Sequence, residues 1–218
     1  MPPTQPEGYF TLPSSGIDGA VLVLHAWWGL NDTLKAFCWR LAEAGFVALA
    51  PDLYHGKLAD TIPAAEALGR QLDANYQQAR AEIAQAAKFL SQYAGQSGGG
   101  IAVVGFSLGA FYALDLSTAQ PELIRKVVVY YGSGVEDFSN SGAAYLGHFA
   151  ENDEFEPQSQ VDHLEQSIRS AGRPVTIHRY PGTGHWFCEP DRLQAYHPAA
   201  AALAWERTLA FLKGSPTA

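Results

Sequence analysis

Six short apolar runs, separated by segments with helical patterning, constrain the fold of this chain more than any other feature. The runs occupy residues 21–24, 46–50, 101–104, 127–131, 144–149 and 175–180. Such continuous hydrophobicity is typical of strands that are buried on both faces. Between the runs, helices are predicted at 31–44, 107–118, 157–171 and 198–213, and a clear three-and-four apolar stripe extends from Tyr76 to Leu90. Strand and helix therefore alternate along the chain.

This alternation predicts a single α/β domain over residues 1–218, with a mostly parallel central sheet and helices on both faces. The connections are long enough for the crossovers that parallel strands require. Residues 8–13 are expected to add an antiparallel strand at one edge of the sheet. In a sheet of this kind, ligands bind beyond the carboxyl ends of the strands.

The composition limits the partners of the chain. Its 218 residues are 47% hydrophobic, and the formal net charge is -8. This charge disfavours binding to nucleic acid or to an anionic membrane surface. The first ten residues, MPPTQPEGYF, lack the positive start and apolar run of a secretory signal, and no apolar stretch reaches the roughly 18 residues of a membrane span. We therefore expect a cytoplasmic protein, monomeric by default, with no nucleic-acid or membrane partner.

Residues 101–109 read IAVVGFSLG and contain the strongest motif of the chain. A predicted strand runs directly into GFSLG, and a predicted helix follows, which is the context of a nucleophile elbow. The turn is so sharp that the positions two before and two after the serine must lack bulky side chains, and Gly105 and Gly109 meet that need. Ser107 would then lie at a helix amino terminus, where N–H groups and the helix dipole favour developing negative charge.

A serine hydroxyl needs a neighbouring imidazole to accept its proton, and seven histidines are available. In an elbow of this kind the acid and then the histidine follow the serine along the chain, which excludes His25 and His55. Four later histidines lie within predicted elements or away from a strand end: His148, His163, His178 and His197. His185 remains, in the glycine-rich loop YPGTGHWF after the last predicted strand, and is predicted to be the general base.

The acid is expected in the loop after the preceding strand, where residues 148–157 read HFAENDEFEP. Asp153 is the preferred residue, since its carboxylate would orient the imidazole and stabilise the imidazolium. Three other carboxylates fit by position alone: Glu151, Glu154 and Glu156. The oxyanion is expected to receive two backbone N–H groups, that of Leu108 after the serine and that of Trp27 in the loop after the first core strand.

Aromatic side chains gather in the loops at the predicted carboxyl ends of the strands, which indicates an apolar or aromatic substrate pocket. The candidates for substrate binding are Trp28, Tyr54, Phe155 and Trp186. Arg70, within a segment at 58–73 that is placed to cover the site, is a candidate for binding an anionic group, although a lone exposed helix charge is more often only solvated. The chain lacks paired metal-ligand spacing and a phosphate-binding glycine loop, so we expect no metal and no cofactor.

With these segments located, the chain resembles the dienelactone hydrolase family along nearly its whole length. The resemblance rests on HAWWGLND, APDLYHG, VGFSLGA, HFAENDEFEP, YPGTGHWF and ALAWERTLAFL. It implies an α/β-hydrolase fold and a serine hydrolase that cleaves carboxylic esters or lactones through an acyl-enzyme on Ser107. It also implies that Asp153 is the acid, and it supports Leu108 and Trp27 as the oxyanion amides.

Three positions depart from the founding members of that family. Those members have a cysteine at the elbow and a glutamate in the loop that matches HAWWG, where this chain has Ser107 and Ala26. They also hold the substrate carboxylate with arginines, one of which corresponds to Glu189. These departures argue against a dianionic dienelactone as substrate. Other functions open to the same scaffold are a thioesterase, a peptide-end hydrolase and a non-catalytic ligand-binding protein.

Overall fold

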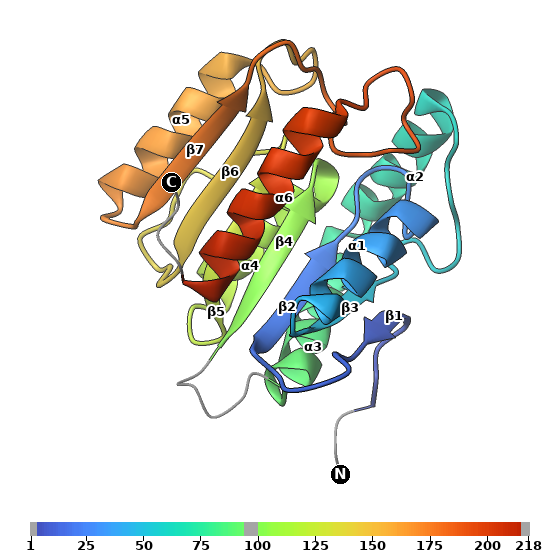
Figure 1. Cartoon of the computed structure of the whole chain (residues 1–218), viewed down its shortest axis with the longest axis vertical. Coiled ribbons are helices and arrows are strands. Elements are labelled where there is room, and N and C mark those ends of the chain that lie inside the picture. Colours follow the sequence, from blue (N-terminus) through green and yellow to red (C-terminus); the bar gives the residue numbers. More distant parts are fainter. Residues whose placement is uncertain (1–3, 94–99, 215–218) are drawn as a thin grey trace.

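The computed structural model describes residues 4–93 and 100–214, and within them it contains one sheet of seven strands. The strands are β1 (Gly8–Thr11), β2 (Gly19–Leu24), β3 (Phe46–Pro51), β4 (Ile101–Phe106), β5 (Ile124–Tyr130), β6 (Ala144–Ala150) and β7 (Val175–Tyr180). Their order across the sheet is β1-β3-β2-β4-β5-β6-β7 (Figure 1). Only β1 runs antiparallel to its neighbour. The predicted mostly parallel sheet and its antiparallel edge strand are confirmed.

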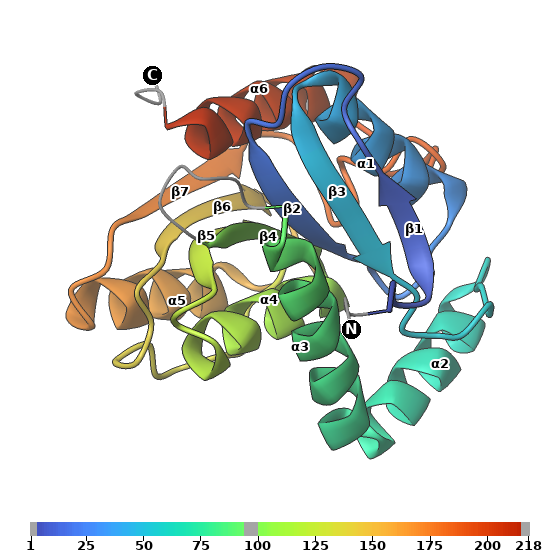
Figure 2. The ribbon, with the colours of Figure 1, turned by 90° about the horizontal axis from the view of Figure 1, so that it is seen from below.

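Helices cover both faces of this sheet (Figure 2). One face carries α1 (Asp32–Glu43) and α6 (Pro198–Lys213), and the other carries α3 (Tyr76–Ser91), α4 (Leu108–Ala119) and α5 (Gln158–Ser170). The remaining helix, α2 (Ile62–Ala74), directly precedes α3 and packs against it. Within the described residues, no helix combines the length and the hydrophobicity that crossing a bilayer requires.

The apolar character of the central strands follows from burial on both faces. Leu22 and Leu24 of β2 pack in the core beneath α3, α4 and α5, whereas Val21 and Val23 pack in the core beneath α1 and α6. Successive side chains of a strand point to opposite faces, so a strand between two helical layers needs apolar residues at every position. The edge strand β7 differs, because most of its side chains are only half-buried.

Local capping sets the ends of the helices that flank the site. The Asn31 side chain accepts a hydrogen bond from the Leu34 amide at 3.1 Å and so begins α1. At the start of α6, the His197 ring accepts a hydrogen bond from the Ala200 amide at 3.2 Å. Gly214 ends α6 with a φ of 74°, a conformation that glycine adopts without steric cost.

Substitution of Ile83 tests how much the packing of α3 against the sheet contributes to the stability of the fold. The side chain is 1% exposed in the core beneath α3. We expect Ile83→Ala to lower the free energy of unfolding by about 2–5 kcal/mol, because it removes buried methyl groups and leaves a cavity. Urea denaturation measures this change. The control is Gln85→Ala on the exposed side of the same helix, and equal losses for the two variants would contradict the assigned core.

Candidate active site

The GFSLG segment forms a tight turn between β4 and α4. Ser107 has a φ of 49° and a ψ of -113°, a left-handed conformation that is rare for a residue with a side chain. Its amide donates a hydrogen bond to the carbonyl of Tyr130 at 2.9 Å. A Cβ atom on Gly105 would collide with the backbone of Gly109, and one on Gly109 would collide with the carbonyl oxygen of Leu24. Both glycines therefore have the steric role that the sequence predicts.

Three predicted side chains meet at the carboxyl edge of the sheet. The hydroxyl oxygen of Ser107 lies 2.9 Å from Nε2 of His185. On the other side of the ring, Nδ1 of His185 lies 2.9 Å and 2.8 Å from the two carboxylate oxygens of Asp153. These residues follow β4, β7 and β6 respectively. The geometry suits transfer of the serine proton to an imidazole that a carboxylate holds in one tautomer.

Asp153 is held in place by its own loop. Its Oδ1 atom accepts hydrogen bonds from the amides of Phe155 and Glu156, both at 2.9 Å. The side chains of Asp153 and His185 are 1% and 5% exposed, so water barely screens their interaction.

The three alternative carboxylates have other partners or positions. Glu151 accepts a hydrogen bond from the Gly182 amide at 2.9 Å. Glu156 accepts one from the Ser133 hydroxyl at 2.6 Å, and burial raises the pKa of its carboxyl above the ordinary value. Glu154 borders a cavity beside His185. Four carboxylates in this loop fit the role of the acid by their sequence position. Among the hydrogen bonds of the described residues, only Asp153 of these four bonds to the His185 imidazole.

Several other histidines have structural partners. Nε2 of His25 accepts a hydrogen bond from the Leu53 amide at 3.2 Å, so its Nδ1 donates to the Ala26 carbonyl at 2.8 Å. Burial lowers the pKa of this ring, which keeps it neutral. His148 is buried in the core, and its ring nitrogens lie 2.8 Å and 3.0 Å from the hydroxyls of Tyr180 and Thr208.

The two candidate oxyanion amides lie on segments that touch each other. Leu108 is the first residue of α4, and Trp27 lies in the loop that follows β2. The backbone of Gly109 approaches the carbonyl groups of Leu24 and His25 so closely that no side chain would fit between them. The helix amino terminus and the loop after β2 are therefore neighbours at the position of Ser107.

Aromatic rings surround His185. Its ring centroid lies 4.8 Å from that of Tyr131, 5.1 Å from that of Phe155 and 4.9 Å from that of Trp186. The Tyr131 hydroxyl donates a hydrogen bond of 2.7 Å to Glu189, whose other carboxylate oxygen is buried and has no hydrogen-bond partner among the residues that the structure describes. Burial raises the pKa of the Glu189 carboxyl to about 8. Sequence analysis missed Tyr131 as a support for the imidazole, because at the end of an apolar strand it looks like any core residue.

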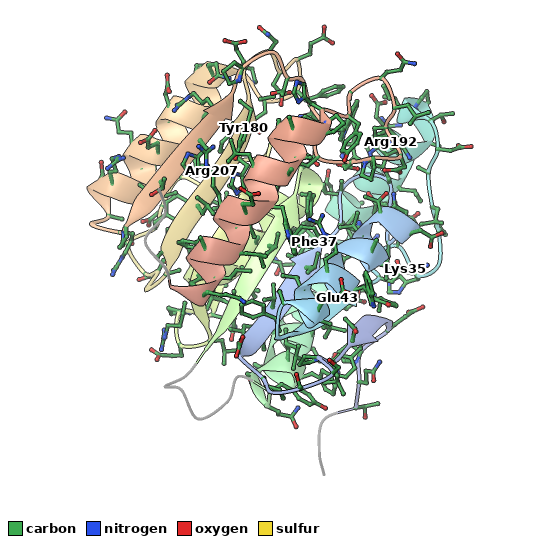
Figure 3. The ribbon with its side chains drawn as sticks, viewed as in Figure 1. Lys35, Phe37, Glu43, Tyr180, Arg192 and Arg207 are labelled. Carbon is green, nitrogen blue, oxygen red and sulfur yellow. The ribbon has the colours of Figure 1, made fainter. Side chains whose placement is uncertain are left out.

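A cavity of about 490 Å³ borders His185 and contains three of the predicted substrate-binding residues, Trp28, Phe155 and Trp186. Trp27 adjoins this group, since its ring lies 5.9 Å from that of Phe155. Arg192 lies on the loop between β7 and α6 (Figure 3). Its side chain also borders the cavity. Nothing in the sequence pattern indicated Arg192, because the loop has no periodic structure from which a side-chain direction follows.

The structure does not bring the other two predicted residues to this cavity. Tyr54 is buried against His25, with ring centroids 4.7 Å apart, and borders a separate cavity of about 190 Å³. Arg70 of α2 is 70% exposed and pairs with Glu66 one helical turn away at 3.3 Å. The first side chain turns into the core and the second lies along the outside of its helix, so neither borders the cavity beside His185.

Comparison with known proteins identifies the family. The family model described as dienelactone hydrolase family matches residues 7–215. The chain belongs to the dienelactone hydrolase family. It is accordingly a hydrolase that acts on ester or lactone bonds, and both the predicted family and the α/β-hydrolase fold are confirmed.

The sequence similarity between this hydrolase and its relatives extends over nearly its whole length. It is 33% identical to "Protein usf" of Aquifex pyrophilus, over 95% of this chain and 92% of that protein. It is 30% identical to the "Putative carboxymethylenebutenolidase" of Aquifex aeolicus, with the same coverage of 95% and 92%. Among solved structures, the "Putative Dienelactone Hydrolase" of Klebsiella pneumoniae superposes with a TM-score of 0.78 at 24% identity, covering 92% of this chain and 90% of that one. This structural match shows the fold.

The buried carboxyl of Glu189 makes stability depend on pH. Its pKa is about 8 in the folded protein against an ordinary value of 4.5. Between these values the unfolded chain releases the proton and the folded protein keeps it. The free energy of unfolding therefore falls as the pH rises through this window, by up to about 1.4 kcal/mol per pH unit, and changes no further above it.

Glu189→Gln tests this dependence, because the amide stays neutral and its oxygen still accepts from Tyr131. We expect the stability of the variant relative to wild type to increase from about pH 5 to about pH 8 and then to level off. Urea denaturation at a series of pH values measures it. The control is Glu165→Gln on α5. If the difference in free energy of unfolding between Glu189→Gln and wild type is constant from about pH 5 to about pH 8, the burial of an un-ionised Glu189 is contradicted.

Proposed function

We propose that this hydrolase cleaves carboxylic esters or lactones through an acyl-enzyme on Ser107, with His185 as general base and Asp153 as the residue that orients it. The single observation that supports this most is the continuous chain of hydrogen-bond contacts from the Ser107 hydroxyl through His185 to Asp153. The family name refers to a lactone, which supports lactones beside open-chain esters as substrates.

The proposed reaction begins with the tautomer of His185. Nδ1–H donates to the Asp153 carboxylate, which leaves the lone pair on Nε2 facing the Ser107 hydroxyl. As the serine oxygen bonds to the carbonyl carbon, its proton passes to Nε2. The charge that develops on the carbonyl oxygen is then stabilised by the backbone N–H groups of Leu108 and Trp27.

Collapse of the tetrahedral intermediate breaks the bond between the acyl carbon and the alcohol oxygen. His185 returns the proton to that oxygen, and the acyl group stays on Ser107. A water molecule then repeats the sequence, with His185 as base, and releases the acid. For a lactone the alcohol oxygen stays attached to the acyl group, so the product is a hydroxy acid.

The residue at position 26 favours a serine nucleophile in this site. Founding members of the family have a glutamate there beside a cysteine, whereas this chain has a fully buried alanine. A carboxylate in this loop, whose backbone at Leu24 and His25 lies against the elbow at Gly109, would oppose the negative charge of the serine oxygen and of the oxyanion. Ala26 and Ser107 therefore form a consistent pair.

Covalent labelling tests the nucleophile. We expect a fluorophosphonate probe to form one adduct on the native protein, and none on Ser107→Ala, because only the activated serine is nucleophilic. The same variant is expected to lose about 10,000-fold or more in kcat for ester hydrolysis, and Asp153→Asn to lose on the order of 10,000-fold. Circular dichroism controls for folding. An equal adduct on Ser107→Ala would contradict Ser107 as the nucleophile, and no adduct on the native protein would favour a ligand-binding protein without catalysis.

A substrate panel separates the acyl chemistries. We expect p-nitrophenyl esters or simple lactones to give a higher kcat/KM than dienelactone, because no arginine stands at position 189 to receive a dienelactone carboxylate. Initial rates at matched substrate concentrations measure this order. Turnover of dienelactone alone would contradict it.

A further inference from the structure

The cavity beside His185 has a wall that is aromatic and continuous with the imidazole. The Phe155 ring lies 5.1 Å from His185 and 5.0 Å from Trp186, and the Trp186 ring lies 5.2 Å from Trp28. The side chains of Ile62 and Leu193 also border the cavity. Such a lining suits an aromatic group, and a volume of about 490 Å³ is ample for the part of a small molecule that carries it.

The charged side chains that border this cavity comprise three carboxylates and one guanidinium. The carboxylates belong to Asp60, Glu154 and Asp191, and the guanidinium belongs to Arg192. Arg192 donates to Asp191 at 2.9 Å, and its guanidinium carbon lies 3.9 Å from the centroid of the Trp28 ring. This cation is therefore already paired with a carboxylate and an aromatic face. Among the ion pairs of the described residues, none includes Asp60 or Glu154.

The position of the cavity relative to the proposed mechanism indicates which half of the substrate it would receive. His185 must place Nε2 within hydrogen-bond reach of the alcohol oxygen in order to protonate it. The group attached to that oxygen therefore extends past the imidazole. Within the described residues, the cavity borders His185 and not Ser107 or Leu108, where the carbonyl carbon and oxyanion would lie.

We propose that this cavity is the binding site for the alcohol half of the ester, and that it selects neutral or cationic aromatic alcohols over alcohols that carry a carboxylate. The inference rests on the proposed function, since it uses His185 as the proton donor to the leaving oxygen. The rings of Phe155 and Trp186 stack on the ring of the alcohol, while Trp28, whose face Arg192 covers, supports Trp186 from behind. The carboxylates of Asp60 and Glu154 repel an anionic substituent and attract a cationic one.

Three acetate esters of one phenol core test the selection. They are phenyl acetate, 3-acetoxybenzoate and 3-acetoxy-N,N,N-trimethylanilinium, which share an acyl group and carry no charge, a negative charge and a positive charge on the alcohol. After division by their rates of hydroxide hydrolysis, we expect kcat/KM for the anionic ester to be about tenfold or more below that of the other two at low salt. Equal values, or a preference for the anion, would overturn the proposal.

Charge-removing variants connect the selection to this cavity. We expect Asp60→Asn and Glu154→Gln each to raise the ratio of kcat/KM for the anionic ester to that for phenyl acetate by about threefold. The matched control is Glu122→Gln, which removes the same charge in the turn before β5, at the opposite end of the strands. The proposal fails if all three variants leave the ratio unchanged or alter it equally.

A second pair of substrates separates the alcohol half from the acyl half. Monophenyl succinate carries its charge on the acyl group, so its rate relative to phenyl acetate is expected to stay constant in Asp60→Asn and Glu154→Gln. If the variants change the rate of monophenyl succinate relative to phenyl acetate but not that of 3-acetoxybenzoate, the cavity binds the acyl half of the ester instead. If the native protein itself shows neither ester turnover nor fluorophosphonate labelling, the proposed function is refuted. The failure of the proposed function is therefore distinguishable from the failure of the alcohol-site proposal.

Discussion

The close packing of backbone around Ser107 is the constraint on which the rest of the structure depends. Gly105 and Gly109 let the end of β4, the start of α4 and the end of β2 approach without intervening side chains. The carbonyl of Ser107 also lies so close to Gly132, after β5, that no Cβ atom fits there. Three neighbouring parallel strands thus fix one hydroxyl at the edge of the sheet, in a conformation that the residue would not adopt alone.

Much of the fold could be predicted because its signals are local. Strands between two helical layers need apolar residues at every position, so β2, β3 and β4 are visible as continuous runs. The start of β5 was not predictable, since Arg125 and Lys126 interrupt its apolar pattern at the less buried end of the strand. The helix α2 was indicated only as a covering segment, although Pro63 in its first turn is a recognisable signal.

The residues of the candidate site also fall into those that the sequence predicts and those that it does not. The strand–turn–helix context predicts Ser107, and the order of elements leaves only His185, because both inferences use topology. Position alone did not separate Asp153 from its glutamate neighbours, since the difference depends on loop hydrogen bonds. The pocket was least predictable: Tyr54 and Arg70 face elsewhere, and Arg192 was missed, because the direction of a loop side chain is set by tertiary packing.

The distribution of the hydrogen-bonded side chains over the sheet has a consequence for how the molecule is made. Ser107 and His185 are 78 positions apart, and Asn31 of the first helix cap bonds Asp191 from 160 positions away. A nascent chain that has completed β4 and α4 carries Ser107 but not yet Asp153 or His185. Under the proposed mechanism, hydrolytic competence therefore arises only when β7 and its following loop join the edge of the sheet. Since an edge strand pairs with only one neighbour, local detachment of β7 would separate His185 from Ser107 and so, under the proposed mechanism, stop the reaction.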